Sequence, residues 1–458
     1  MPARYHSAAV IILGIALSAL DGTIFNLALP GIARDLHASA ADSVWVVNAY
    51  QLAALAMLLP LAALGDRFGY RRIYLCGIAV FTAASAVCFV STSLQMLAAA
   101  RGVQGLGAAG IMAVNGALVR LTYPRHLFGR GIALNSAVVA TASVAGPSVA
   151  AVVLSVATWP WLFTLNLPLG GIVVWLGWRA LPHNTPSSTK GARISLLDVA
   201  LNAMMFSLLF VGVHVLGTAT DGPPEPGRLA PSIGLVLVAV LVGLIYLRRQ
   251  LSLVVPLFPI DLLRIPLFAL SMCTSVASFA AQTLSYIALP FLLLEGWKYS
   301  QLETGLLITV WPLAIVAVAP LAGRMIGRYP GGLLGGMGLA ALAAGLALLA
   351  ALPEHPSSGN IAWRMALCGA GFGLFQSPNN HTILTSAPAH RSGAAGGMLA
   401  TARLTGQNIG AVLLAVIFSL WNAHNGQGPM IALWLAAGFA AIASLFSILR
   451  VRHAPTRV

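Results

Sequence analysis

Long apolar stretches recur from one end of this chain to the other, each long enough to cross a lipid bilayer. A helix crosses the hydrocarbon core in about 20 residues. Such windows lie at residues 8–29, 44–64, 73–92, 95–118, 132–154, 161–180, 197–217, 231–250, 266–292, 303–325, 331–351, 361–383, 396–420 and 430–450. Only 8% of the 458 residues are charged, whereas about 25% are charged in an average soluble domain. The sequence therefore predicts an all-α polytopic membrane protein with fourteen spanning helices.

The basic residues predict an orientation. If the N-terminus is cytoplasmic, nineteen of the 25 Lys and Arg residues fall on the cytoplasmic side, including those at the cytoplasmic ends of windows. Three fall outside, and three fall within windows away from their cytoplasmic ends. Cytoplasmic loops of membrane proteins carry this excess of positive charge, so both termini are expected in the cytoplasm. The same distribution argues against nucleic acid as a partner, although the net charge is +14, because the basic residues form short clusters between apolar windows.

The chain contains an internal repeat. The run PLAALGDRF at 60–68 returns in part as PLAGRMIGRY at 320–329. Further along, Arg101 with Gly105, Gly107 and Gly110 is echoed by Arg364 with Gly369, Gly371 and Gly373. Duplicated halves are typical of alternating-access transporters. We therefore expect a six-helix bundle at residues 1–182, a linking helix pair with its flanking loops at 183–260, and a second six-helix bundle at 261–458.

Asp21 is the acid that most directly indicates function. It lies inside the first apolar window, where an acidic side chain costs about 2.5–3.5 kcal/mol on insertion scales, so ionisable residues there are functional candidates. Burial disfavours the charged form of a carboxylate and a nearby arginine favours it. A carboxyl balanced between these effects can exchange a proton as its surroundings change, and we predict proton coupling at Asp21. The alternative is a structural role.

Arg101 is the predicted partner of this proton site. It lies in the fourth window, and a buried arginine must pair or line a water-filled cavity. We expect it to tune the proton site, with Gln104 as a polar neighbour, or else to have a purely structural role.

A glycine-rich basic loop joins the second and third windows. It contains Gly65, Asp66, Arg67, Gly69, Arg71 and Arg72. The glycines permit a tight turn, and Asp66 can face a helix N-terminus or a basic partner such as Arg130. The segment could be an ordinary basic loop, but it resembles the loop between helices two and three of the major facilitator superfamily. That resemblance implies a conformational-switch role for these residues and Arg130.

Three further stretches resemble the drug:proton antiporter branch of that superfamily, which has fourteen transmembrane helices. They are LDGTIFNLALP at 20–30, RGVQG at 101–105, and Gly146-Pro147, which resembles the antiporter motif. Within the branch, the chain is most similar to bacterial exporters of quaternary ammonium compounds and methyl viologen. It departs from the family pattern after Pro147, where a glycine pair is replaced by SVAA, and at Gly327, where the second-half loop lacks the expected acid.

The candidate substrate cavity is aromatic and rich in amides. Aromatic faces attract organic cations, and apolar walls with few polar groups suit varied ligands. The candidates are Asn26, Trp45, Asn48, Tyr50, Gln51, Gln104, Gln376, Asn379, Asn380 and Arg403. Arg403 is expected to be either a gate near the cytoplasmic mouth or a packing anchor, and any single Trp or Tyr could instead anchor the protein at the lipid interface.

Several absences narrow the chemistry. The sequence has no GxxxxGK[ST] phosphate loop, and its ten histidines show no metal-site spacing. Its four cysteines lie within apolar stretches and are expected to be small core residues. We therefore expect no metal and no cofactor, with the proton gradient as energy source.

These observations together predict a transporter that is not an enzyme. The leading hypothesis is a proton-coupled antiporter that exports amphipathic compounds, cationic ones in particular, across a bacterial-type inner membrane. The alternative is a major facilitator transporter of an endogenous metabolite or siderophore. An intramembrane enzyme or receptor is disfavoured because a paired nucleophile and base and a soluble output domain are missing. Expected partners are the substrates, protons and membrane lipids, and a duplicated chain is expected to function as a monomer.

Overall fold

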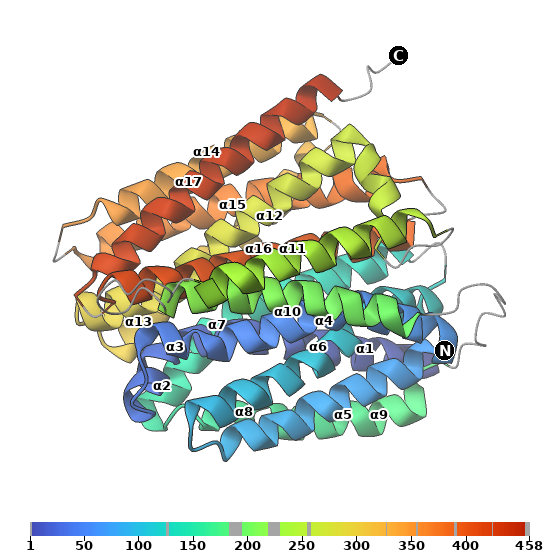
Figure 1. Ribbon diagram of the computed structural model, residues 1–458, viewed down its shortest axis with the longest axis horizontal. Helices are drawn as coiled ribbons and strands as arrows, with labels where there is room; N and C mark the ends of the chain where they lie inside the picture. Colours follow the sequence, from blue (N-terminus) through green and yellow to red (C-terminus); the bar gives the residue numbers. More distant parts are fainter. Residues whose placement is uncertain are drawn as a thin grey trace. The chain divides into compact units, whose positions relative to one another are not determined.

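The computed structural model is built from helices (Figure 1). It describes residues 2–124, 128–182, 195–218, 230–253, 258–326, 328–353, 356–388, 392–423 and 425–453, without the side chains of some helical residues such as Arg130. The chain divides into two compact units, namely Met1–Val211 with Gly234–Arg248, and Gly212–Ile233 with Arg249–Val458. These are called unit 1 and unit 2. Most of the predicted linking pair belongs to unit 1, and the three-part division at residues 182 and 260 stays a prediction.

A helix of at least 15 residues lies at each of the fourteen predicted windows. In chain order they are α1 (Pro2–Ile24), α4 (Trp45–Phe68), α5 (Tyr70–Phe89), α6 (Leu94–Thr122), α7 (Phe128–Val156), α9 (Asn166–Ala180), α10 (Leu196–Thr218), α11 (Ala230–Leu251), α12 (Pro266–Phe291), α13 (Gln301–Met325), α14 (Gly331–Ala350), α15 (Ser358–Ser386), α16 (Ser392–Leu420) and α17 (Gln427–Leu449). Within the described residues, 11 helices are long and apolar enough to cross a membrane. The count of fourteen crossings and the orientation of the termini stay predictions.

Short helical segments connect some of these long helices. They are η1 (Phe25–Leu27), α2 (Leu29–Asp35), α3 (Ala40–Ser43), α8 (Trp161–Thr164), η3 (Ile260–Arg264), the π-helical turn η4 (Leu292–Gly296) and η6 (Arg450–His453). The predicted loop at 65–72 is almost entirely helical, because α4 continues through Phe68 and α5 begins at Tyr70. Gly69, with φ of 100°, makes the whole turn, which only glycine adopts without strain. The expected tight turn between the second and third windows is therefore present, and it is shorter than the predicted loop at 65–72.

The two units repeat the same close helix contacts. In unit 1, a Cβ on Gly105 of α6 would overlap the carbonyl oxygen of Tyr50 on α4; in unit 2, a Cβ on Gly369 of α15 would overlap that of Trp311 on α13. Small residues let membrane helices approach closely. The sequence separations are 264 residues for the glycines and 261 for their partners, so the predicted repeat appears in the packing of each unit.

A proline inside α4 is matched by a side chain from α10. Pro60 lacks the N–H that a helix would direct to the carbonyl of Ala56. The Nδ2 of Asn202, a fully buried residue of α10, donates to that oxygen at 2.7 Å. Buried carbonyl groups need a donor, so this bond ties α10 to the proline turn of α4 within unit 1.

Candidate functional site

Asp21 lies on α1 in the interior of unit 1, where 1% of the residue is exposed. Three side chains donate to its carboxylate. Nη1 of Arg101 lies 2.6 Å from Oδ2, while Nε2 of Gln104 and Nδ2 of Asn166 lie 3.0 and 2.8 Å from Oδ1. The donors come from α6 and from the first residue of α9. The expected pairing of Asp21 with Arg101 is therefore present, with Gln104 beside it.

Arg101 has a second set of partners that does not include the carboxylate. Its Nε donates to the carbonyl oxygen of Val46 at 3.1 Å, and its Nη1 also donates to Oε1 of Gln104 at 2.7 Å. The guanidinium carbon lies 4.8 Å from the ring centre of Phe25 and 4.3 Å from that of Tyr50. Cation–π contacts are worth about 2 kcal/mol or more when desolvated. The arginine charge is thus compensated from several directions.

Ser85 of α5 fixes the two amides. Its Oγ accepts from Nε2 of Gln104 at 2.8 Å and from Nδ2 of Asn166 at 3.3 Å, and it donates to the carbonyl of Phe81 at 2.8 Å. Both amide nitrogens therefore point toward Asp21 and Ser85. Four long helices, α1, α5, α6 and α9, meet at this polar cluster, which we call the Asp21 cluster.

Arg101 has contacts that do not depend on the charge of Asp21. If Asp21 gains a proton, its ionic attraction to Arg101 is lost, but the bonds of Arg101 to Val46 and Gln104 and its two ring contacts do not depend on the carboxylate charge. Removing one partner of a buried ion pair normally costs about 3–5 kcal/mol because the other charge is left alone. The alternative partners of Arg101 reduce that cost.

The residues of the predicted switch loop surround the α4–α5 turn. Gly65 is buried, whereas Asp66, Arg67 and Arg72 are exposed. The phenol of Tyr70 donates to Oδ1 of Asp66 at 2.6 Å, a partner that sequence reasoning missed. The proposed contact with Arg130 lies outside the described residues because that side chain is not described.

Other contacts fix the two ends of this turn. Arg67 lies against the ring of Phe68, 5.2 Å from its centre. Arg71 donates to the carbonyl oxygen of Trp178 on α9, so the start of α5 is attached to the end of α9.

Gly146 and Pro147 are buried within α7. A Cβ on Gly146 would overlap Oγ1 of Thr23, two residues beyond Asp21 on α1. The absence of a side chain therefore lets α7 pack directly against the α1 segment that carries the acid.

The predicted cavity residues of unit 1 differ in their surroundings. Asn26 and Trp45 are half-buried, and Tyr50 lies over Arg101. Asn48 and Gln51 are buried on α4, and both amide atoms of Asn48 and Oε1 of Gln51 have no hydrogen-bond partner among the described residues. Buried polar atoms normally have partners, so these amides can still accept a ligand contact.

The predicted cavity residues of unit 2 also include both half-buried and fully buried side chains. Gln376 and Asn380 are half-buried on α15, and the guanidinium of Arg403 lies 5.6 Å from the ring centre of Phe279. Asn379 is fully buried, donates to Ser275 at 2.7 Å and accepts from Arg450 at 2.5 Å. Asn379, like Gln104 in unit 1, uses its amide for internal bonds rather than facing a cavity.

Sequence reasoning missed a second buried arginine. Arg450, the last residue of the window at 430–450 and expected on the cytoplasmic side, is 1% exposed and donates to Ser271 of α12, Asn379 of α15 and Ser447 of α17. Asn166 and Ser85 were also given no role. The sequence signal that could have identified them is that Asn166 and Ser85 are polar residues within apolar windows, where polar side chains usually form hydrogen bonds with other helices.

Two further acids and two of the four cysteines are buried. Asp198 and Glu295 are buried as well as Asp21. Cys88 and Cys368 are buried as expected, but Cys76 and Cys273 are exposed, because an apolar window includes a face that is turned outward. Among the described residues, no group of three or more His, Cys, Asp or Glu side chains could hold a metal ion.

Comparison with known proteins places these features in a family. The Major Facilitator Superfamily pattern matches residues 11–411 and, separately, 270–458. The chain is 51% identical over 457 residues to the uncharacterized transporter YebQ of Escherichia coli (strain K12), covering 100% of this chain and 98% of that one.

More distant relatives have named activities. The multidrug resistance protein Stp of Mycobacterium tuberculosis (strain CDC 1551 / Oshkosh) is 30% identical over 413 residues, covering 89% of this chain and 75% of Stp. The riboflavin transporter RibZ of Clostridioides difficile (strain 630) is 28% identical over 416 residues, covering 91% and 88%. A solved bacterial homologue of the human lysosomal transporter Spinster shares the fold, with a TM-score of 0.68, 14% identity and coverage of 99% and 98%.

Proposed function

Because the chain belongs to the major facilitator superfamily, whose members similar to it are transporters and not enzymes, we propose that it is a proton-coupled antiporter. In this proposal it exports amphipathic, cationic compounds across the bacterial inner membrane by alternating access. It functions as a monomer, without a cofactor, and the proton gradient supplies the energy. The relative Stp, named for multidrug resistance, supports export of this kind.

The observation that carries the proposal is the buried Asp21 cluster. Coupling requires a group that binds a proton in one state and releases it in another, and Asp21 is a buried acid whose ion-pair partner has other contacts. Protonation of Oδ2 removes the ionic contact that links α1 to α6. Deprotonation restores it, so the proton changes how strongly two helices of unit 1 are held together.

The expected charge balance follows from the number of acids. One carboxyl at Asp21 exchanges one proton for one positive charge on the substrate. A divalent cation needs a second acid, and buried Glu295 in unit 2 is the candidate. Both amide atoms of Asn48 and Oε1 of Gln51 are proposed polar contacts for the substrate in unit 1. The half-buried Gln376, Asn380 and Arg403 are candidates in unit 2.

The test measures ethidium uptake and proton release in inverted membrane vesicles, with and without a pH gradient. Wild-type protein is expected to accumulate the dye only with the gradient. Asp21→Asn is expected to lose accumulation while still binding the dye or exchanging it passively, because the amide keeps hydrogen bonds but cannot carry a proton. Asp42→Asn, which changes a half-buried acid of α3 outside the Asp21 cluster, is the matched control and should accumulate dye normally.

Two results would contradict the proposal. If Asp21→Asn accumulates dye against a gradient as well as wild type does, Asp21 is structural and proton coupling lies elsewhere. If wild-type vesicles ignore every organic cation tried, the proposal of cationic-drug export fails while membership of the family stands.

The second candidate function is transport of an endogenous metabolite or siderophore. The riboflavin transporter RibZ favours it, because it aligns with 91% of this chain. Counterflow of labelled metabolites in liposomes would distinguish the candidates: saturable metabolite exchange without dye transport would replace the drug-export proposal.

A further inference from the structure

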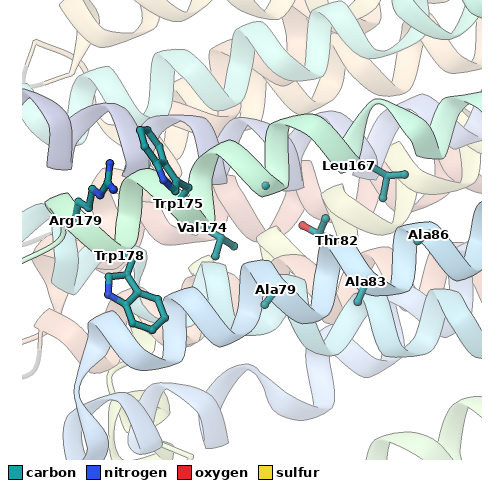
Figure 2. A pocket seen from close by; sticks show the side chains of 10 residues that line it. Ala79, Thr82, Ala83, Ala86, Leu167, Val174, Trp175, Trp178 and Arg179 are labelled. Carbon is teal, nitrogen blue, oxygen red and sulfur yellow. The ribbon is translucent and has the colours of Figure 1, made fainter.

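An apolar groove runs between α5 and α9 in unit 1, on a surface that the Asp21 cluster does not use. Figure 2 shows it lined by small residues of α5, with the aromatic and charged side chains of α9 at one end. It encloses about 710 Å³, and its lining is Ala79, Thr82, Ala83, Ala86, Leu167, Gly171, Val174, Trp175, Trp178 and Arg179. The groove is therefore almost entirely apolar.

Glycines create the groove. A Cβ on Gly170 would overlap Oγ1 of Thr82, so α9 and α5 approach closely there. At Gly171, one residue further on, a Cβ would have no neighbouring atom within 4 Å. The close approach and the missing side chain leave an open channel beside the helix contact.

The mouth of the groove is exposed. Trp175 and Trp178 are 57% and 72% exposed. Large exposed apolar surfaces mark contacts with other molecules, and in a chain with 11 apolar helices of spanning length the surrounding solvent is lipid. A hydrocarbon chain is thus the occupant with matching chemistry.

Positive charge lies at one end of the groove only. The guanidinium of Arg179 stacks on Trp175, 4.4 Å from the ring centre, which holds the charge at the groove mouth. Arg71 is fixed beside it through the Trp178 carbonyl, and exposed Arg72 follows on α5. The acid near this end, Asp66, is bound by the hydroxyl of Tyr70. The end is therefore complementary to an anionic headgroup.

The length of the groove agrees with one lipid leaflet. Leu167 and Arg179 are twelve residues apart on α9, which corresponds to about 18 Å at 1.5 Å per residue. One leaflet of hydrocarbon is about 15 Å deep, half of a core of about 30 Å. We propose that this groove binds one acyl chain of an anionic phospholipid, with its phosphate at Arg179 and Arg71.

The experiment is native mass spectrometry of the purified full-length protein, incubated with equal amounts of phosphatidylglycerol and phosphatidylethanolamine. Wild type is expected to retain a phosphatidylglycerol adduct in preference. Arg179→Gln should lower that preference about five-fold, the equivalent of about 1 kcal/mol for one basic residue near a lipid surface. Gly171→Leu should remove the adduct of either lipid, because leucine fills the channel.

Matched controls separate this effect from general changes. Gly438→Leu adds the same side chain at another open helical glycine, and Arg264→Gln removes another exposed arginine. Both should keep the wild-type adduct, and thermal unfolding should show that all four variants are folded.

Three outcomes would overturn the proposal. Adducts unchanged in Arg179→Gln and Gly171→Leu would place the lipid elsewhere. Equal retention of the two lipids by wild type would show that the arginines do not select an anionic headgroup. Loss of ethidium binding in Gly171→Leu, with lipid adducts intact, would make the groove a substrate path instead.

Discussion

The bond between Asn202 and the proline turn of α4 gives a prediction that can be tested by a double-mutant cycle. Asn202 donates to the Ala56 carbonyl, which Pro60 leaves without its helical donor. In Asn202→Ala the carbonyl loses this donor. In Pro60→Ala the backbone N–H of residue 60 becomes available for the same carbonyl, so Asn202 is no longer needed there.

The size of the effect follows from the two groups involved. An unsatisfied buried acceptor costs about 1–3 kcal/mol. Oδ1 of Asn202 itself has no partner among the described residues, so its removal offsets part of that cost. We expect Asn202→Ala to lower the free energy of unfolding by about 1–2 kcal/mol in wild type and by less than about 0.5 kcal/mol in Pro60→Ala, a coupling of about 1 kcal/mol.

The assay is unfolding of the purified protein in mixed micelles by increasing denaturing detergent, followed by tryptophan fluorescence. Asn408→Ala is the control. This buried residue donates to the Leu404 carbonyl within α16, so its effect should be the same in wild type and in the Pro60→Ala background. An equal cost for Asn202→Ala in both backgrounds would refute the argument, and so would no cost in wild type.

Two further substitutions test packing. Gly146→Ala should lower the free energy of unfolding by about 1–3 kcal/mol, which is typical of an overpacked core, because its Cβ meets Thr23. Adding Thr23→Ala should restore part of the lost stability. If it does not, α7 relieves the overlap by shifting elsewhere. Arg450→Lys should cost about 2–4 kcal/mol in the same assay, because lysine cannot reproduce the fork of bonds to Ser271, Asn379 and Ser447. Wild-type stability of that variant would show that the cluster does not hold α12, α15 and α17 together.

Sequence alone located the helices because lipid imposes a simple rule. A backbone in hydrocarbon must satisfy its own hydrogen bonds, so apolar windows of about 20 residues become helices whatever their neighbours are. At 65–72 the sequence predicted a tight turn between two helices, but not that these helices would continue to Phe68 and restart at Tyr70. Charges do not end a helix that extends beyond the lipid, and a single glycine with positive φ was enough for the turn.

The candidate site was predictable only in part. The sequence shows which side chains are costly to bury in a membrane, but it does not show toward which partners a side chain points. Asp21 and Arg101 were found because burying either is expensive, and each therefore requires the other. Asn166 and Asn379 are inexpensive to bury once paired, and their partners are distant in sequence. Arg450 was missed because an arginine at the cytoplasmic end of the last window resembles any exposed arginine until the helix packing is known.

The two units share helix packing but not chemistry, and this difference bears on where coupling occurs. Arg364, the repeat partner of Arg101, donates to Asn360 on its own helix and lies over Trp363. At the repeat offset of 261 residues, Asp21 corresponds to Gln282, which cannot exchange a proton. The two units therefore share the glycine contacts that allow helices to pack. The Asp21–Arg101 ion pair belongs to unit 1, and the corresponding positions of unit 2, Gln282 and Arg364, do not form such a pair. In the proposed mechanism, a proton at Asp21 changes the strength of contacts inside unit 1. Exchange of one proton for one charge then needs no second site of the same kind.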